Sequence, residues 1–258
     1  MWLRRLIFGL PLLALVIYAH AYLFRRLVRP IRHTWVRTTI VVICASIVIA
    51  AFALRTANAL PPTGLAIAIM AWAGFLLYTF LWMLLAQGAG KFKPERRALF
   101  DRGALVLASG VSGYGAYAAF AAPEINEIVI PLPKLPKTLD GLRIVQLTDI
   151  HIGPLIQERF LRDMVERANA LKPDLTVITG DLVDGKVPAL GQFARELGRL
   201  NGRFGKYFVT GNHDYYSGAD EWVAFVRQLG FDVLRNESRL LPEGLRLVGV
   251  DDWSAHRF

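Results

Sequence analysis

Four apolar stretches in the first 122 residues constrain the fold of this chain more than any other feature. None of them contains Asp, Glu, Lys or Arg, and about 20 apolar residues in a helix suffice to cross a bilayer core. The last stretch is rich in glycine, which is more frequent in membrane helices than in soluble ones. We therefore predict a membrane domain at residues 1–122 with about four transmembrane helices, at Leu6–Phe24, Thr38–Leu54, Leu65–Leu85 and Ala104–Ala122.

Charge divides the chain at the same point. Residues 1–122 hold 13 Lys and Arg against 2 Asp and Glu, whereas residues 123–258 hold 17 against 19. A nucleic-acid-binding domain usually carries a basic face, so the near-neutral second half argues against nucleic acid as a partner. The partner that the first half indicates is the membrane, and nothing in the sequence sets an oligomeric state.

The basic residues between the apolar stretches predict the orientation. They gather in the segments 25–37 and 91–102, and the positive-inside rule places such segments in the cytoplasm. With four spans, both termini and the second half then lie on the extracytoplasmic side. We expect a multi-pass protein of the cell (inner) membrane, and the loss of one span would reverse the side.

The second half has the pattern of an α/β domain, because short apolar runs alternate with segments of helical spacing. The expected strands are Glu127–Ile130, Leu142–Leu147, Leu175–Thr179, Lys206–Thr210, Phe231–Leu234 and Leu245–Val250. The expected helices are Pro154–Leu171, Ala189–Leu200 and Asp220–Leu229.

Polar motifs follow three of these strands. They are Thr148-Asp149-Ile150-His151, Gly180-Asp181-Leu182-Val183-Asp184-Gly185 and Gly211-Asn212-His213-Asp214. Ligands of α/β sheets bind beyond the carboxyl ends of the strands, so we expect the three motifs to meet there. Each motif alone is compatible with a plain turn or a helix cap. Their common position after strands is what favours a site.

The residue types in these motifs suit a pair of metal ions. Asp149 and His151 alternate along an extended segment, so both side chains can reach one ion. Asp181 offers a carboxylate that can bridge two ions, and Asn212 offers a neutral oxygen to the second. Mixed oxygen and nitrogen ligands favour Mn, Fe or Zn, and two such ions can promote attack on a phosphoryl group.

Together the motifs resemble the D-x-H, G-D-x-x-D and G-N-H-D signatures of the calcineurin-like metallophosphoesterase superfamily. The run Leu142–Gly153 resembles the membrane-anchored bacterial branch of that superfamily. The resemblance implies a β-sandwich flanked by helices, of which residues 123–258 would form the N-terminal part. It also implies a metal-dependent hydrolase of phosphomonoesters or phosphodiesters.

The same resemblance implies a role for each motif residue. Asp149 and His151 would bind the first metal ion, Asp181 would bridge, and Asn212 would bind the second ion. His213 would contact the phosphate and protonate the leaving group. Asp184 would pair with His213 and hold it protonated, whereas we interpret Asp214 as a supporting or capping residue.

Later metal-binding histidines of the superfamily have no counterpart here. The chain has five histidines, and past His213 only His256 remains, outside any recognisable motif. We interpret His256 as a bystander. We therefore expect a fragment or a truncated gene product, in which these 258 residues alone bind metal poorly and have little or no turnover.

Several functions stay open at this point. The substrate could be a lipid-linked phosphate, since the helices would hold the site near a bilayer, but a soluble phosphodiester fits the motifs equally well. An alternative is an inactive pseudoenzyme that binds phosphate ligands. Another is a membrane scaffold or sensor, whereas a transporter is disfavoured because the apolar stretches contain no charged side chain.

Overall fold

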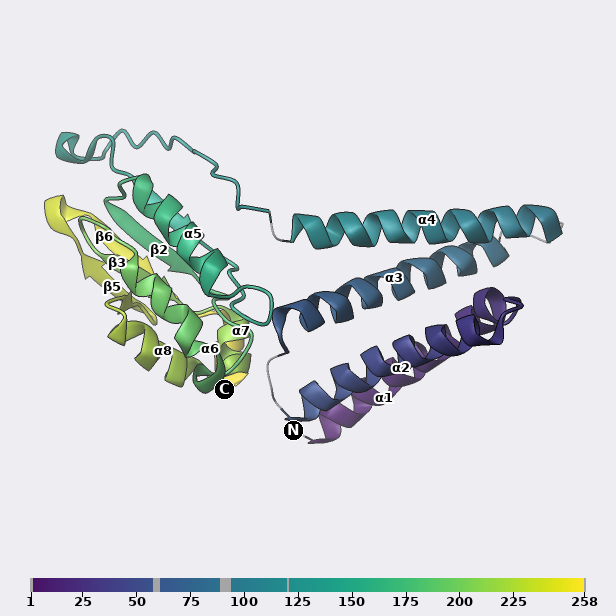
Figure 1. Cartoon of the computed structure of the whole chain (residues 1–258). Coiled ribbons are helices and arrows are strands. Elements are labelled where there is room, and N and C mark those ends of the chain that lie inside the picture. The colour runs from purple at the N-terminus through teal and green to yellow at the C-terminus, as the bar shows by residue number, and fades with distance from the viewer. Residues whose placement is uncertain (1, 58–60, 89–93, 120, 258) are drawn as a thin grey trace. The chain divides into compact units, whose positions relative to one another are not determined.

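The computed structural model describes residues 2–57, 61–88, 94–119 and 121–257 (Figure 1). The chain divides into two compact units, Met1–Ala121 and Ala122–Phe258, here named the helical unit and the sheet unit. The division falls where composition and charge change along the sequence. Each unit has its own core and its own kind of surface.

The helical unit contains long helices at each predicted apolar stretch. They are α1 (Trp2–Leu23), continued by a π-helical turn at Phe24–Val28, α2 (Thr34–Ala57), α3 (Thr63–Gly88) and α4 (Pro94–Ala118). Within the described residues, Thr34–Leu54 and Thr63–Ala86 are long and apolar enough to cross a membrane. Four spans therefore remain a prediction. Helix α4 begins with a proline, which suits the first helical turn, and carries charges before its apolar part.

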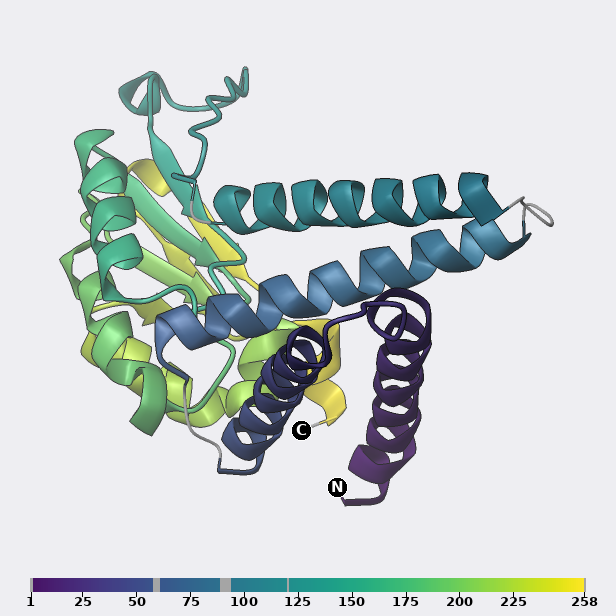
Figure 2. The ribbon, with the colours of Figure 1, turned by 45° about the vertical axis from the view of Figure 1, so that its right-hand side comes forward.

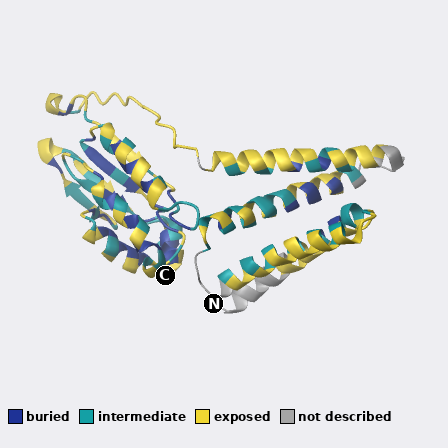
Figure 3. Cartoon of the chain, viewed as in Figure 1, coloured by how far each residue is buried: buried dark blue, intermediate teal, exposed yellow. Residues whose placement is uncertain are grey.

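Helix α3 is central to the helical unit, because it packs along α4 and also touches α1 and α2 (Figures 1 and 2). Its buried side chains meet those of α1 and α4 in one cluster made of Ala19, Leu23, Leu76, Phe80, Met83 and Ala104. Many outward side chains are nevertheless large and apolar: Trp35 is 71% exposed, Ile49 67% and Leu85 70%. Figure 3 shows much of α2 and α4 in the colour of exposed residues. Such a surface is suited to hydrocarbon rather than water.

The sheet unit is built on a four-stranded parallel sheet with the order β1-β2-β3-β4. In the register of the sheet, Leu147 pairs with Ile178 and Thr179 pairs with Val209. The strands are β1 (Ile144–Leu147), β2 (Leu175–Thr179), β3 (Lys206–Val209) and β4 (Asp232–Val233). The connecting helices are α5 (Glu158–Ala170), α6 (Val187–Ala194), extended by a 3-10 turn at Arg195–Arg199, α7 (Asn212–Ser217) and α8 (Ala219–Gln228).

Each face of this sheet has its own cover. An antiparallel hairpin, β5 (Glu237–Leu240) and β6 (Arg246–Gly249), packs its apolar side chains on one face. The cluster there contains Leu175, Val177, Tyr207 and Val209 of the sheet with Leu241, Leu245 and Leu247. Helices α5, α6 and α8 lie on the other face (Figures 1 and 2), toward which the alternate residues Ile178 and Phe208 point. The layered α/β architecture is thus as predicted.

The predicted fold was wrong at residues 127–130 and omitted two short elements. Residues 127–130 form no strand: Ile128 is 79% exposed and Val129 84% exposed. Their β-branched composition favours a strand, but among the described residues they have no neighbouring strand to pair with, and prolines follow. The prediction also missed β5, whose sequence Glu-Ser-Arg-Leu lacks an apolar run, and the six-residue helix α7.

Candidate metal centre

The three polar motifs lie at one edge of the sheet, because β1, β2 and β3 are adjacent and parallel. Asp149 follows β1, Asp181 follows β2, and Asn212 begins α7 after β3. Hydrogen bonds between the first two loops continue past the strands. The Asp149 N–H donates to the Gly180 carbonyl at 3.2 Å, and the His151 N–H donates to the Asp181 carbonyl at 3.0 Å. The loops are therefore held in fixed register.

Three of the predicted ligands have a left-handed backbone. The φ angles are 53° at Asp149, 50° at His151 and 51° at Asp181. This conformation costs roughly 1–2 kcal/mol for a residue other than glycine. Residues in such unfavourable conformations cluster at functional sites, where the surrounding structure holds them in place. Their concentration at one sheet edge supports a functional site there.

Two glycines allow the second and third loops to touch. A Cβ at Gly180, where φ is 87°, would lie 2.7 Å from the Gly211 nitrogen. A Cβ at Gly211 would collide with the backbone and carboxylate of Asp181. Both glycines are needed for the close approach that brings Asp181 beside Asn212.

The first-metal residues and the predicted bridge come together. Asp149, His151 and Asp181 each offer a ligand atom, and these atoms lie within 4.8 Å of one another. The Nε2 atom of His151 is 4.0 Å from Oδ2 of Asp181. The hydroxyl of Thr148 donates to Asp149 Oδ2 at 2.6 Å, which orients that carboxylate. Two carboxylates and an imidazole form a suitable donor set for a divalent transition metal.

Asp184 lies between two imidazole rings. Its Oδ1 atom is 2.6 Å from Nδ1 of His213, which is the pairing that the resemblance implied. The same oxygen is 3.1 Å from Nδ1 of His151, a contact that the sequence did not predict. The two rings stand edge to face, with centroids 4.6 Å apart. Because Nδ1 of each ring contacts Asp184, Nε2 is the atom of each ring that can bind another group.

The side-chain amide of Asn212 lies beside the two carboxylate oxygens of Asp181. The backbone N–H of His213 donates to Asp181 Oδ1 at 2.9 Å, which fixes the start of α7 against the carboxylate. If the Asn212 amide nitrogen faced Asp181, it would donate to Oδ2 at 3.2 Å and to Oδ1 at 3.3 Å. With the amide oxygen there instead, three acceptors converge, and a cation would make that arrangement favourable. This geometry fits the predicted second-metal role.

Asp214 holds the second and third loops together, which agrees with our interpretation of it as a supporting residue. It is 0% exposed and accepts hydrogen bonds from the backbone N–H groups of Leu182 at 3.0 Å and Gly211 at 2.9 Å. Burial raises the pKa of Asp214 to about 6, although these backbone hydrogen bonds lower it. The side chain thus joins the Asp181 loop to the Asn212 loop.

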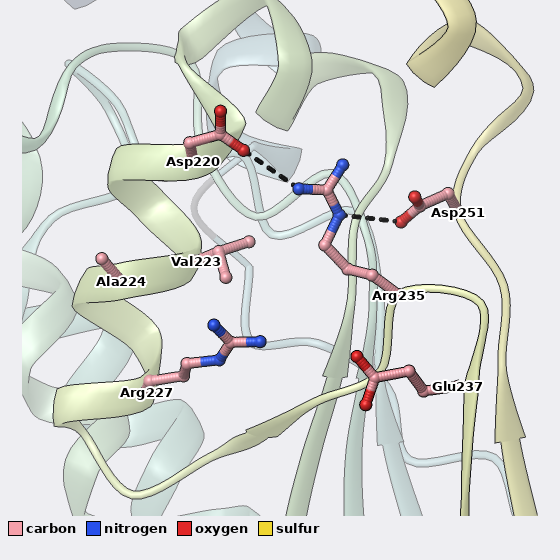
Figure 4. A pocket seen from close by; sticks show the side chains of 7 residues that line it. All are labelled: Asp220, Val223, Ala224, Arg227, Arg235, Glu237 and Asp251. Carbon is pink, nitrogen blue, oxygen red and sulfur yellow. Dashed lines mark hydrogen bonds and ion pairs between the residues drawn. The ribbon is translucent and has the colours of Figure 1, made fainter.

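A polar network that sequence reasoning missed lies behind the β3–α7 turn. Arg235 donates to Asp251 Oδ1 at 3.1 Å, to Asp220 Oδ1 at 3.0 Å and to the Tyr215 hydroxyl at 3.1 Å. The Thr210 hydroxyl donates to the Tyr215 hydroxyl at 3.1 Å. Arg235 also lines a cavity of about 440 Å³ between α8 and the β5–β6 hairpin (Figure 4). No motif or spacing marks Arg235, so the sequence offered no signal for it.

His256 does not join the candidate metal centre in the described part of the chain. It lies in a 3-10 turn at Trp253–Arg257, where its Nδ1 contacts the Trp253 carbonyl. Its ring packs edge to face against the Trp253 ring, with centroids 5.0 Å apart. Neither of the possible metal-holding groups among the described residues includes it.

A parallel sheet with carboxylate, imidazole and amide side chains at its strand ends offers a donor set suited to divalent metal ions. Residues 142–255, within the sheet unit, match the family described as calcineurin-like phosphoesterase. No solved structure matches the chain.

Curated relatives extend the similarity beyond the sheet unit. A "transmembrane protein with metallophosphoesterase domain" of Danio rerio is 38% identical over 159 residues, covering 59% of this chain and 36% of the relative. A protein of the same name from Bos taurus is 35% identical over 190 residues, covering 68% of this chain and 43% of the relative. An "uncharacterized metallophosphoesterase" of Aquifex aeolicus is 39% identical over 134 residues, covering 52% of this chain and 51% of the relative.

The shares covered show how much of each relative is matched and how far the matches extend along this chain. The chain spans about a third to a half of the length of these relatives. The bovine match covers more of the chain than the sheet unit alone contains, so it reaches into the helical unit. The Danio rerio and Bos taurus relatives are named as transmembrane proteins, and two described helices of this chain are long and apolar enough to cross a membrane.

Proposed function

We propose that this protein is a membrane-anchored phosphoesterase that uses two divalent metal ions and hydrolyses phosphomonoesters or phosphodiesters. The observation that carries the proposal is the convergence of Asp149, His151 and Asp181 at one sheet edge, beside His213 and Asp184. Asp149 and His151 would hold the first ion, Asp181 would bridge, and Asn212 would hold the second. Mn, Fe or Zn suits this donor set.

The ions would polarise the phosphoryl group and activate the attacking water. The protein supplies orientation and a proton. Asp184 accepts a hydrogen bond from Nδ1 of His213 at 2.6 Å, which turns Nε2 toward the substrate. From that nitrogen His213 would protonate the leaving oxygen, and a positioned acid of this kind contributes roughly 100- to 10,000-fold to a rate.

One contact supports the membrane orientation that we propose. The Nε atom of Arg26, after α1, donates to Asp101 Oδ1 in α4 at 2.9 Å. This pair supports placing the basic segment after α1 and the charged start of α4 on the same side, the cytoplasm. The sheet unit follows the other end of α4, so we place it outside the cytoplasm. A lipid-linked phosphate is then a substrate within reach of the site.

The test of this proposal is metal-dependent binding of inorganic phosphate, measured by calorimetry on the purified chain in detergent. We expect phosphate to bind only after Mn²⁺ is added, and only weakly, because we expect these 258 residues alone to bind metal poorly. Asp181→Ala should weaken Mn²⁺ binding by about 100-fold or more, because the carboxylate shared by both ions is lost. Asp163→Ala, which removes an exposed carboxylate of α5, serves as the matched control and should change nothing.

The same samples separate the enzyme from the pseudoenzyme. Mn²⁺-dependent cleavage of a chromogenic phosphodiester that disappears in Asp181→Ala supports the enzyme. Phosphate binding with no cleavage leaves these 258 residues a ligand-binding role, which agrees with the low turnover that we expect of them. Equal Mn²⁺ affinity in Asp181→Ala and in the unaltered chain would refute the bridging role.

A further inference from the structure

An exposed aromatic ring lies beside the proposed general acid. The ring of Tyr216 is three residues beyond His213 on α7, and the two ring centroids are 5.6 Å apart at an interplanar angle of 60°. Tyr216 is 56% exposed, whereas its neighbour Tyr215 is 5% exposed and belongs to the Arg235 network. The two tyrosines therefore differ in what they face. Tyr215 supports the fold, and Tyr216 presents a ring to solvent at the site.

The geometry of His213 indicates which part of a substrate would meet that ring. Nδ1 of His213 is engaged by Asp184, so Nε2 is the atom that would approach the leaving oxygen. Among the described residues, the His213 ring contacts the rings of His151 and Tyr216, with centroids 4.6 Å and 5.6 Å away. His151 belongs to the proposed metal cluster and would lie beside the phosphoryl group. The ring of Tyr216 is more than half exposed beside His213, where it could contact the group attached to the leaving oxygen.

We infer that Tyr216 forms one wall of a leaving-group subsite and favours phosphoesters whose leaving group carries a planar aromatic ring. This inference rests on the proposed function, because His213 must act on the leaving oxygen. Aromatic rings prefer offset-stacked or edge-to-face partners. A tyrosine also offers a large contact area at a small loss of side-chain entropy, since it has only two rotatable side-chain bonds.

The test compares two phosphonates that bind but are not hydrolysed. Phenylphosphonate carries the ring, and methylphosphonate lacks it. Calorimetry is done on the Mn²⁺-loaded chain in detergent, with inorganic phosphate as the common reference. For each form of the chain, we take the ratio of the affinity for phenylphosphonate to the affinity for methylphosphonate. This ratio should be about fivefold larger in the unaltered chain than in Tyr216→Ser.

Two variants separate ring contact from other effects of Tyr216. Tyr216→Phe keeps the ring and should keep the preference for phenylphosphonate. Tyr117→Ser removes a tyrosine of α4 that is 75% exposed, and it should leave every affinity unchanged. Inorganic phosphate should bind equally well to all four forms.

Each other outcome overturns the inference in a recognisable way. An unchanged preference in Tyr216→Ser, with phosphate still bound, overturns the subsite and leaves the proposed function standing. Loss of phosphate binding in Tyr216→Ser shows that the ring supports the site rather than the leaving group. Absence of phosphate binding in the Mn²⁺-loaded unaltered chain overturns the proposed function and the subsite together.

Discussion

The helical unit and the sheet unit place polar and apolar side chains in opposite ways. In the helical unit the Arg26–Asp101 pair is turned inward, with side chains 9% and 17% exposed, while large apolar side chains point outward. In the sheet unit Trp222 and Phe208 are 0% and 1% exposed, and polar side chains gather at one sheet edge. The difference indicates that the two units are built for different solvents, hydrocarbon and water.

The comparison also shows where each unit tolerates unfavourable chemistry. The helical unit accepts a shielded ion pair, which is favourable only while both partners are present. The sheet unit accepts left-handed residues at Asp149, His151 and Asp181. Shielded charge in the first unit joins helices, whereas backbone strain in the second positions the candidate ligands.

The largest effect on stability is expected from breaking the ion pair of the helical unit. Asp101→Ala leaves Arg26 without its carboxylate in a shielded position, and such a change costs about 3–5 kcal/mol. The measurement is thermal unfolding of the chain in detergent micelles. The double variant Arg26→Leu with Asp101→Leu should recover most of the loss. A loss below about 1 kcal/mol would mean that the pair is solvated like a surface pair. The contrast between shielded charge in the helical unit and exposed polar side chains in the sheet unit would then not hold.

A smaller effect is expected from the network behind the metal centre. Arg235→Met removes hydrogen bonds to Asp251, Asp220 and Tyr215 and should destabilise the sheet unit by about 2 kcal/mol. Arg227→Met is the matched control, because Arg227 lines the same cavity and has no ion pair among the described residues. Urea denaturation followed by tryptophan fluorescence measures both. Equal losses in the two variants would show that the network adds nothing.

The smallest effect is a pH dependence in the sheet unit. Burial lowers the pKa of Lys206 from its ordinary 10.5, and its ammonium donates to the Gly198 and Leu229 carbonyls at 2.8 Å each. Compared with the unfolded state, the folded state therefore gives up this proton at a lower pH. Its stability should rise as pH increases through the lowered pKa toward 10.5.

Lys206→Met removes this dependence, since methionine does not titrate. The urea midpoint of the unaltered chain should therefore increase relative to that of Lys206→Met as pH rises from below the lowered pKa toward the ordinary lysine pKa of 10.5. Lys134→Met, in an exposed segment, should follow the unaltered chain. A parallel pH course for all three proteins would contradict the assigned cause.

Much of the fold was predictable because burial leaves a clear pattern. Strand β2 has the predicted bounds Leu175–Thr179, since a central parallel strand is apolar on both faces. The helix expected at Ala189–Leu200 is instead α6 followed by a 3-10 turn. Residues 127–130 show the limit, because strand-like composition does not provide a partner strand.

The site was predictable for a different reason. Motif spacing placed Asp149, Asp181 and Asn212 at adjacent strand ends, and the structure brings them together there. Sequence could not show that Asp184 contacts both His151 and His213, because side-chain reach depends on the backbone angles of the loops. Whether these residues hold two metal ions stays a prediction.

The Arg26–Asp101 pair also imposes an order on biosynthesis. The two residues are 75 positions apart, so the arginine leaves the ribosome long before its carboxylate exists. In the membrane orientation that we propose, the long arginine side chain would until then extend to the lipid headgroups and so remain hydrated. The pair can close only after the start of α4 has been synthesised. Assembly of α1 with α4 is therefore a late event in the synthesis of the helical unit. A nascent chain halted before Asp101 would lack the contact that joins these two helices.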